Sequence, residues 1–142
     1  MRMTRMQKSP VITVPIFYSL IAAQFILPII AVLIDVLNPQ PELALLDKTL
    51  IIEPQNLEFF IICAAFILVC IITFGLFLRK HWARKAYLYT FFPAFLLYFL
   101  PSMHWIYMSS FAAIFNDLAF VCSGILLTIL ATPILYEPLF KE

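Results

Sequence analysis

Residues 59–78 read FFIICAAFILVCIITFGLFL, a run that contains no Asp, Glu, Lys or Arg. Three other long stretches are equally free of charge: residues 9–34, 86–116 and 118–136. A helix needs roughly 20 mostly apolar residues to cross the hydrocarbon core of a bilayer, and each of the four stretches is about that long or longer. The sequence therefore predicts an all-α, polytopic membrane protein with four transmembrane helices.

The composition agrees with this fold class and leaves no room for a soluble domain. Of the 142 residues, 64% are hydrophobic and 12% are charged, and the mean hydropathy is +1.02. A soluble domain of this length needs far more polar surface. We therefore expect one transmembrane domain over residues 1–142. Its helices are predicted at about 11–36, 57–78, 83–101 (with Pro93 inside) and 111–135, and the tail from Tyr136 onward is expected to leave the membrane.

The connection over residues 38–56 is predicted to lie at the outer membrane interface. Prolines stand at its two ends, and Leu43, Leu46 and Leu50 between them follow helical spacing. This pattern favours a short helix or turn on the membrane surface, although residues 50–52 also suit an extended chain. The connection is either a cap over the outer end of the bundle or a plain linker.

The positive charges predict the orientation. Lys and Arg gather on the cytoplasmic side of membrane proteins. Eight of the nine basic residues precede the first helix, join the second to the third, or follow the fourth, and only Lys48 falls on the other side. Both termini are therefore predicted to be cytoplasmic, and the setting is expected to be a bacterial inner membrane.

A basic turn joins the second and third predicted helices. Cations meet lipid phosphates at the membrane interface, and an indole ring prefers the same depth. The lipid bilayer is thus the first predicted partner of this chain. The residues expected to contact its headgroups are Arg79, Lys80, Trp82, Arg84 and Lys85.

Three carboxylates near the outer helix ends are the main polar candidates. Asp35 closes the first helix, Glu58 opens the second, and Asp117 lies near the start of the fourth. Together they would form an acidic cluster that binds a cation or a partner's basic side chain. The alternative is that each carboxylate meets water or caps a helix end. No acid reaches the middle of a span, where the ionisable groups of transporters usually lie.

The sequence holds no pattern that is typical of an enzyme. His81 and His104 fall on opposite sides of the membrane, and no metal-ligand spacing occurs within a span. Two glycines in the whole chain exclude a glycine-rich phosphate loop. No basic patch lies outside the membrane-flanking positions, so nucleic acid is not an expected partner. We therefore predict no catalytic residues, no cofactor and no metal.

The remaining candidate residues are those that could contact another helix within the membrane. Gln24 is the one strongly polar side chain in the middle of the first span, and such an amide usually bonds to another helix. Phe91, Phe95 and Phe99 form an aromatic stripe on the third predicted helix. This stripe faces the bundle, lipid or another membrane subunit. These four residues are the predicted contact sites.

The segment LRKHWARKAY, residues 78–87, resembles the basic Trp-Ala-Arg turn of small bacterial four-helix membrane proteins whose function is uncharacterised. The end of the chain over residues 130–140, which contains PILYEPLF, is similar to the way some of them end. This resemblance implies an inner-membrane setting and no particular activity.

Three functions are consistent with the sequence. The first is a non-enzymatic membrane protein that acts through intramembrane helix contacts, as an accessory subunit of a membrane complex or as a self-associating homo-oligomer. The second is a small channel or transporter oligomer with an acidic outer mouth. The third is an immunity protein against a membrane-active toxin.

Overall fold

The structure, a computed structural model, describes residues 12–42, 45, 55–100 and 108–140, and all the secondary structure in these residues is helical. Helices α1, α3 and α5 are each long and apolar enough to cross a membrane. In chain order the helical elements are α1 (Val14–Leu37), α3 (Asn56–Phe77), α4 (His81–Phe91), the 3₁₀ helix η1 (Pro93–Phe99), α5 (Ser110–Ala131) and α6 (Pro133–Tyr136).

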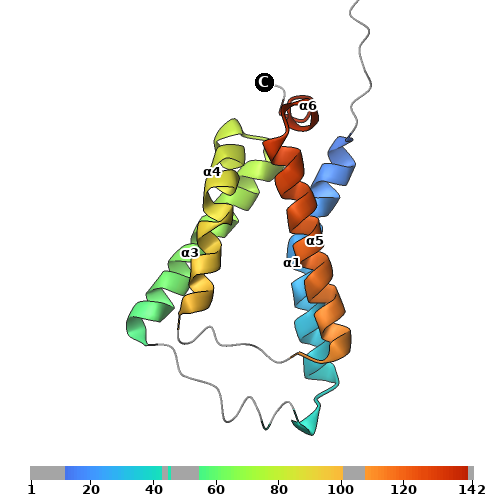
Figure 1. Ribbon diagram of the computed structural model, residues 1–142, viewed down its shortest axis with the longest axis vertical. Helices are drawn as coiled ribbons and strands as arrows, with labels where there is room; N and C mark the ends of the chain where they lie inside the picture. Colours follow the sequence, from blue (N-terminus) through green and yellow to red (C-terminus); the bar gives the residue numbers. More distant parts are fainter. Residues whose placement is uncertain (1–11, 43–44, 46–54, 101–107, 141–142) are drawn as a thin grey trace, which may run out of the picture.

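The helices form two antiparallel pairs that diverge from one end of the molecule. Helix α1 packs along α5, which is the most extensive helix contact, and α3 packs against α4. Figure 1 shows the two pairs close together beside α6 and far apart at the opposite end. We call these the closed end and the wide end, and the space between the pairs the crevice.

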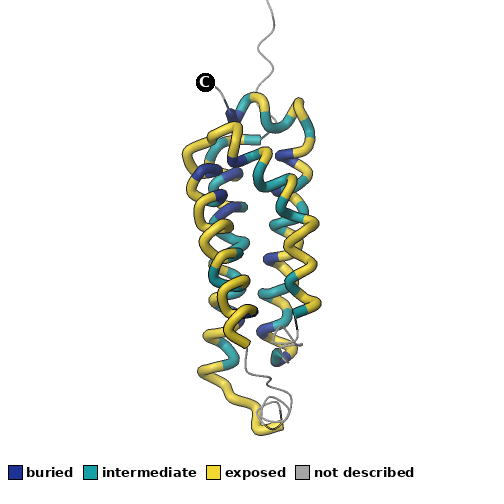
Figure 2. The backbone as a smooth tube through the Cα atoms, turned by 90° about the vertical axis from the view of Figure 1, so that its left-hand side faces the viewer, coloured by how far each residue is buried: buried dark blue, intermediate teal, exposed yellow. Residues whose placement is uncertain are grey.

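The hydrophobic core lies at the closed end, where all four long elements and the end of the chain meet. Figure 2 shows most of the buried positions gathered there, with further ones between α1 and α5. Interlocking side chains of this kind hold the two helix pairs together at the closed end. The core residues are Phe17, Ile21, Ile72, Leu76, Ala83, Leu126, Ile129, Leu130, Leu139 and Phe140.

The prediction that the tail leaves the membrane stays a prediction, but the described end of the chain does not extend away from the helices. Instead, α6 turns the chain back over the closed end, and Leu139 and Phe140 are 1% and 3% exposed. The ring of Phe140 packs edge-on against Phe17 with 5.8 Å between centroids. The two side chains are large and apolar, so their burial adds to the core that joins the helix pairs.

The third predicted helix is helical over most of its length but is not a continuous α-helix. The α-helix ends at Phe91, and the chain continues as a 3₁₀ helix that begins at Pro93. Proline has no N–H to donate to the carbonyl four residues earlier, and its ring clashes with that carbonyl. The other predicted spans agree with α1, α3 and α5 to within a few residues, except that α5 ends at Ala131 before Pro133.

The turn between α3 and α4 is closed by backbone hydrogen bonds. The N–H of Lys80 donates to the carbonyl of Gly75, and the N–H of Arg79 donates to that of Leu76, both at 2.9 Å. Arg79 has φ 52°, the left-handed conformation that ends many helices in this hydrogen-bond pattern. The turn brings α4 so near to α3 that a Cβ on Gly75 would lie 2.6 Å from the Cβ of Ala83.

The outer connection lies mostly outside the described residues. Pro41 and Glu42 are helical, but the predicted surface helix, with Leu43, Leu46 and Leu50, cannot be placed within the described part of the chain.

Candidate functional site

A partly open cavity of about 470 Å³ occupies the crevice between the two helix pairs. Its wall comes from α1 and α5 on one side and from α3, α4 and η1 on the other. The lining side chains are mostly apolar and aromatic, and none of them is charged. They are Gln24, Phe25, Ala65, Leu68, Val69, Ile72, Thr73, Tyr87, Thr90, Phe91, Pro93, Ala94, Phe95, Leu97, Tyr98, Phe120 and Ser123.

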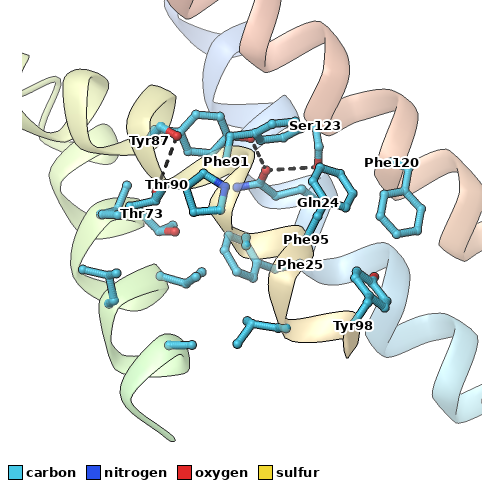
Figure 3. Close-up of a pocket in the computed structure, with 17 residues that line it drawn as sticks. Gln24, Phe25, Thr73, Tyr87, Thr90, Phe91, Phe95, Tyr98, Phe120 and Ser123 are labelled. Atoms are coloured by element: carbon cyan, nitrogen blue, oxygen red, sulfur yellow. Dashed lines mark hydrogen bonds between the residues drawn. The ribbon is translucent and has the colours of Figure 1, made fainter. Parts of the chain in front are cut away.

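A small polar network crosses the cavity at Gln24. The hydroxyl of Tyr87 on α4 donates a hydrogen bond to Oε1 of Gln24 at 3.3 Å, and Oγ of Ser123 on α5 lies 3.4 Å from the same oxygen. Ser123 also donates to the carbonyl of Ala119 at 2.9 Å. Figure 3 shows the Gln24 side chain reaching from α1 toward α4, with its amide at the centre of the lining residues. The network therefore links three helices within an apolar surface.

The positions of Gln24 and Ser123 along their helices explain why they meet. Gln24 lies 13 residues before Leu37, where α1 ends. Ser123 lies the same 13 residues after Ser110, where α5 begins. Antiparallel helices with the same rise bring such positions to the same depth. Sequence reasoning singled out Gln24 alone, but this matching of depths was a signal that also pointed to Ser123.

The Gln24 side chain directs its amide oxygen toward the network and leaves its amide nitrogen as a donor. The Tyr87 hydrogen bond ends on Oε1, and Oγ of Ser123 lies beside the same oxygen, so the Nε2 group faces away from both hydroxyls. Among the described residues Nε2 has no hydrogen-bond partner. The hydroxyl of Thr90 is already used, because it donates to the carbonyl of Ala86 at 2.7 Å. The site thus presents an N–H donor within an apolar, uncharged cavity.

Two of the three aromatic residues predicted as contact sites line the same cavity as Gln24. Phe91 and Phe95 pack edge-to-face with 5.8 Å between ring centroids, and Phe95 stacks on Tyr98. Phe99 does not line the cavity and is 84% exposed. The break at Pro93 changes the helical register, which is why the stripe predicted for a continuous α-helix does not keep one face.

The three outer carboxylates have separate surroundings. Asp35 accepts hydrogen bonds from Ser109, whose hydroxyl also caps the first turn of α5. Glu58 is 8% exposed, and its Oε2 has no hydrogen-bond partner among the described residues. Asp117 is exposed on α5. Figure 1 places the start of α3 and the end of α1 at different corners of the wide end, and no hydrogen bond between described residues joins the three acids.

Of the five side chains in the basic turn that were predicted to contact headgroups, four are exposed and one contacts the rest of the protein. Arg79, Lys80, Trp82 and Lys85 are exposed. Arg84 instead reaches across the closed end, where Nη1 donates to the carbonyl of Leu130 at 3.0 Å and the guanidinium lies 3.8 Å from the centre of the Tyr136 ring. This contact satisfies a carbonyl at the end of α5 with a cation, which the helix dipole favours there.

Within the described ranges no three His, Cys, Asp or Glu side chains gather closely enough to hold a metal ion. Comparison with known proteins gives no match to this chain, whether with family models, curated proteins or solved structures. The resemblance of the basic turn to small bacterial membrane proteins therefore stays a prediction.

Proposed function

We propose that this chain is a non-enzymatic, multi-pass membrane protein that acts by holding another component of the bilayer in its crevice. The single observation that carries the proposal is the cavity of about 470 Å³, lined by apolar and aromatic side chains around one polar network. Binding sites for small molecules usually have this size and this mixture of side chains.

The membrane setting rests on helix length and hydropathy. Three helices meet the requirements for crossing. The fourth crossing is formed by α4 and η1 together, since 11 residues of α-helix and 7 residues of 3₁₀ helix rise about 30 Å in total. About 23 Å of this rise lies beyond Arg84 and Lys85, so the crossing requires these side chains to extend to the interface or the bilayer to thin locally. Membrane helices tolerate a proline break where the freed backbone groups find other hydrogen-bond partners.

The proposed orientation has both termini on the cytoplasmic side of a bacterial inner membrane. The start of α1, the α3–α4 turn and α6 all lie at the closed end in Figure 1. The basic segments of the sequence flank these same elements, so a single layer of anionic headgroups would contact all of them. The crevice then widens toward the outer side.

This function is a specific form of the contact-mediated function that the sequence favours. An accessory-subunit role, self-association, transport and toxin immunity all stay predictions. Transport through an acidic mouth has the least support, because Asp35 is bonded to Ser109 and the wide end separates α1 from α3.

The test is site-specific photo-crosslinking from within the crevice in native membranes. The photoreactive amino acid benzoylphenylalanine would replace Phe95, which lines the cavity, and in a matched control Phe99, which is exposed and does not line it. We expect one discrete adduct from position 95 and only heterogeneous phospholipid adducts from position 99, identified by mass spectrometry. The same adducts from both positions would contradict the proposed function.

A further inference from the structure

The cavity has a defined hydrogen-bonding preference, which restricts what it can hold. Gln24 accepts on Oε1 from the Tyr87 hydroxyl, so the carbonyl half of its amide has a partner within the protein. Its Nε2 group carries two N–H bonds and accepts nothing. An N–H donor that faces an apolar cavity is available to an occupant with an acceptor oxygen, and a hydrogen bond is stronger there than in water.

The occupant is expected to be uncharged. None of the side chains that line the cavity belongs to an Asp, Glu, Lys, Arg or His. An ion in such a place would have no counter-charge, and burying an unpaired charge costs far more than burying a neutral polar group. The route to the crevice in a bilayer also passes through hydrocarbon, which favours a lipid-soluble molecule.

The shape and chemistry of the wall favour a flat ring. Besides Tyr87, aromatic side chains from α1, α4, η1 and α5 line the cavity, and Figure 3 shows them around the Gln24 amide. Aromatic faces and edges pack well against a planar ring. A carbonyl oxygen on that ring accepts hydrogen bonds and donates none, and the Nε2 of Gln24 can donate one to it. These further aromatic side chains are Phe25, Phe91, Phe95, Tyr98 and Phe120.

We propose that the crevice binds a neutral, membrane-soluble molecule whose flat ring carries a carbonyl oxygen, as in quinones, and that the Nε2 of Gln24 donates a hydrogen bond to that oxygen. This inference rests on the proposed function and names the chemical class of the bound component. It concerns binding alone and includes no electron transfer. The hydroxyl of Thr73, which lines the same cavity, is available as a second donor on the α3 wall.

The experiment compares two probes that differ in their carbonyls. The purified full chain in detergent micelles is titrated with tritiated decylbenzoquinone and with decylbenzene, and binding to empty micelles is subtracted. We expect the wild type to bind the quinone more tightly than decylbenzene. Gln24→Leu should weaken quinone binding about two- to tenfold, the usual effect of one neutral hydrogen bond, and leave decylbenzene binding unchanged.

A control substitution and an infrared measurement of the bound quinone complete the test. Thr128→Val removes a hydroxyl that is bonded to its own helix and does not line the cavity, so it should leave the preference for the quinone unchanged. The infrared carbonyl stretch of the bound quinone should move to lower wavenumber in the wild type. A carbonyl stretch unchanged from that in an apolar solvent would overturn the proposal, even if Gln24→Leu failed to fold.

The outcomes also separate this inference from the proposed function. Equal binding of both probes to the wild type and to Gln24→Leu would overturn the role of the amide. No quinone binding, together with a discrete adduct from position 95, would overturn the inference and leave the proposed function standing. Identical adducts from positions 95 and 99 would remove the proposed function itself.

Discussion

Asp35 and Ser109 join the last turn of α1 to the first turn of α5. The hydroxyl of Ser109 donates to Oδ1 of Asp35, and the backbone N–H of Ser109 donates to the same oxygen at 3.3 Å. The Ser109 hydroxyl also accepts a hydrogen bond from the N–H of Ala112, which makes it the N-cap of α5. One carboxylate therefore positions the residue that starts the next long helix.

Removing this carboxylate should lower the stability of the α1–α5 pair. We expect Asp35→Ala to reduce the free energy of unfolding by about 1.5–3 kcal/mol, since hydrogen bonds to charged groups contribute this much. Unfolding by SDS titration in mixed micelles measures it. In a double-mutant cycle with Ser109→Ala, the coupling should exceed about 0.5 kcal/mol. The control Asp117→Asn removes an exposed carboxylate and should cost less than about 0.5 kcal/mol. Additive single effects would contradict the interpretation.

The two glycines should respond to alanine with opposite signs. A Cβ on Gly75 would lie 2.6 Å from the Cβ of Ala83 and 2.7 Å from Cζ2 of Trp82, whereas a Cβ on Gly124 meets nothing within 4 Å. We expect Gly75→Ala to destabilise by about 1–3 kcal/mol through overpacking. Gly124→Ala should stabilise by up to about 1 kcal/mol, because alanine is the better helix former. The same SDS titration tests both variants, and equal effects would show that α3 and α4 are not in close contact.

Arg84 should stabilise the protein through the planar geometry of its guanidinium group as well as through its charge. Lysine keeps the charge of Arg84 but cannot both donate to the Leu130 carbonyl in the same planar geometry and stack on Tyr136. We therefore expect Arg84→Lys to lower the unfolding free energy by about 1–2 kcal/mol. Lys85→Arg, at the exposed neighbouring position, should have almost no effect. A similar loss in both variants would argue for a general effect of the basic turn.

Three single-cysteine variants test the topology, in a background that lacks Cys63, Cys70 and Cys122. The chosen positions, Lys85, Ser110 and Glu137, are all exposed. With four crossings, a membrane-impermeant maleimide added to intact spheroplasts should label only the cysteine at position 110. Labelling at 85 would reverse the orientation. Protection at 85 with labelling at 137 would show that α4 and η1 do not cross.

The sequence alone located most of the helices, because their ends coincide with charges and prolines. The span predicted for residues 57–78 is observed at Asn56–Phe77, and the basic residues 79 and 80 follow directly. The length of an apolar segment can be read from the local sequence, so predicting a span requires no knowledge of tertiary contacts. The break of the third helix was also a local event at Pro93, but a proline alone does not indicate whether a helix bends or becomes 3₁₀.

The crevice could not be predicted in the same way. A helix that is apolar all round gives no periodic signal of which face packs against protein and which faces elsewhere. Gln24 indicated one polar contact, but the roles of Tyr87 and Ser123 depend on how α4 and α5 are rotated about their axes. The burial of Leu139 and Phe140 depends on the chain reversal at α6, which composition and apolar length do not indicate.

Because the shared core lies at the closed end, a small rotation of a helix pair there moves its far end by a larger distance. Each pair is held near Phe140 and extends from there as an arm of 22 to 24 residues, which is about 35 Å long. A rotation of about 5° at the pivot would move the far tip by about 3 Å, roughly the thickness of an aromatic ring. Small changes in side-chain volume at position 140 would therefore alter the gap at the wide end, far from any residue they touch.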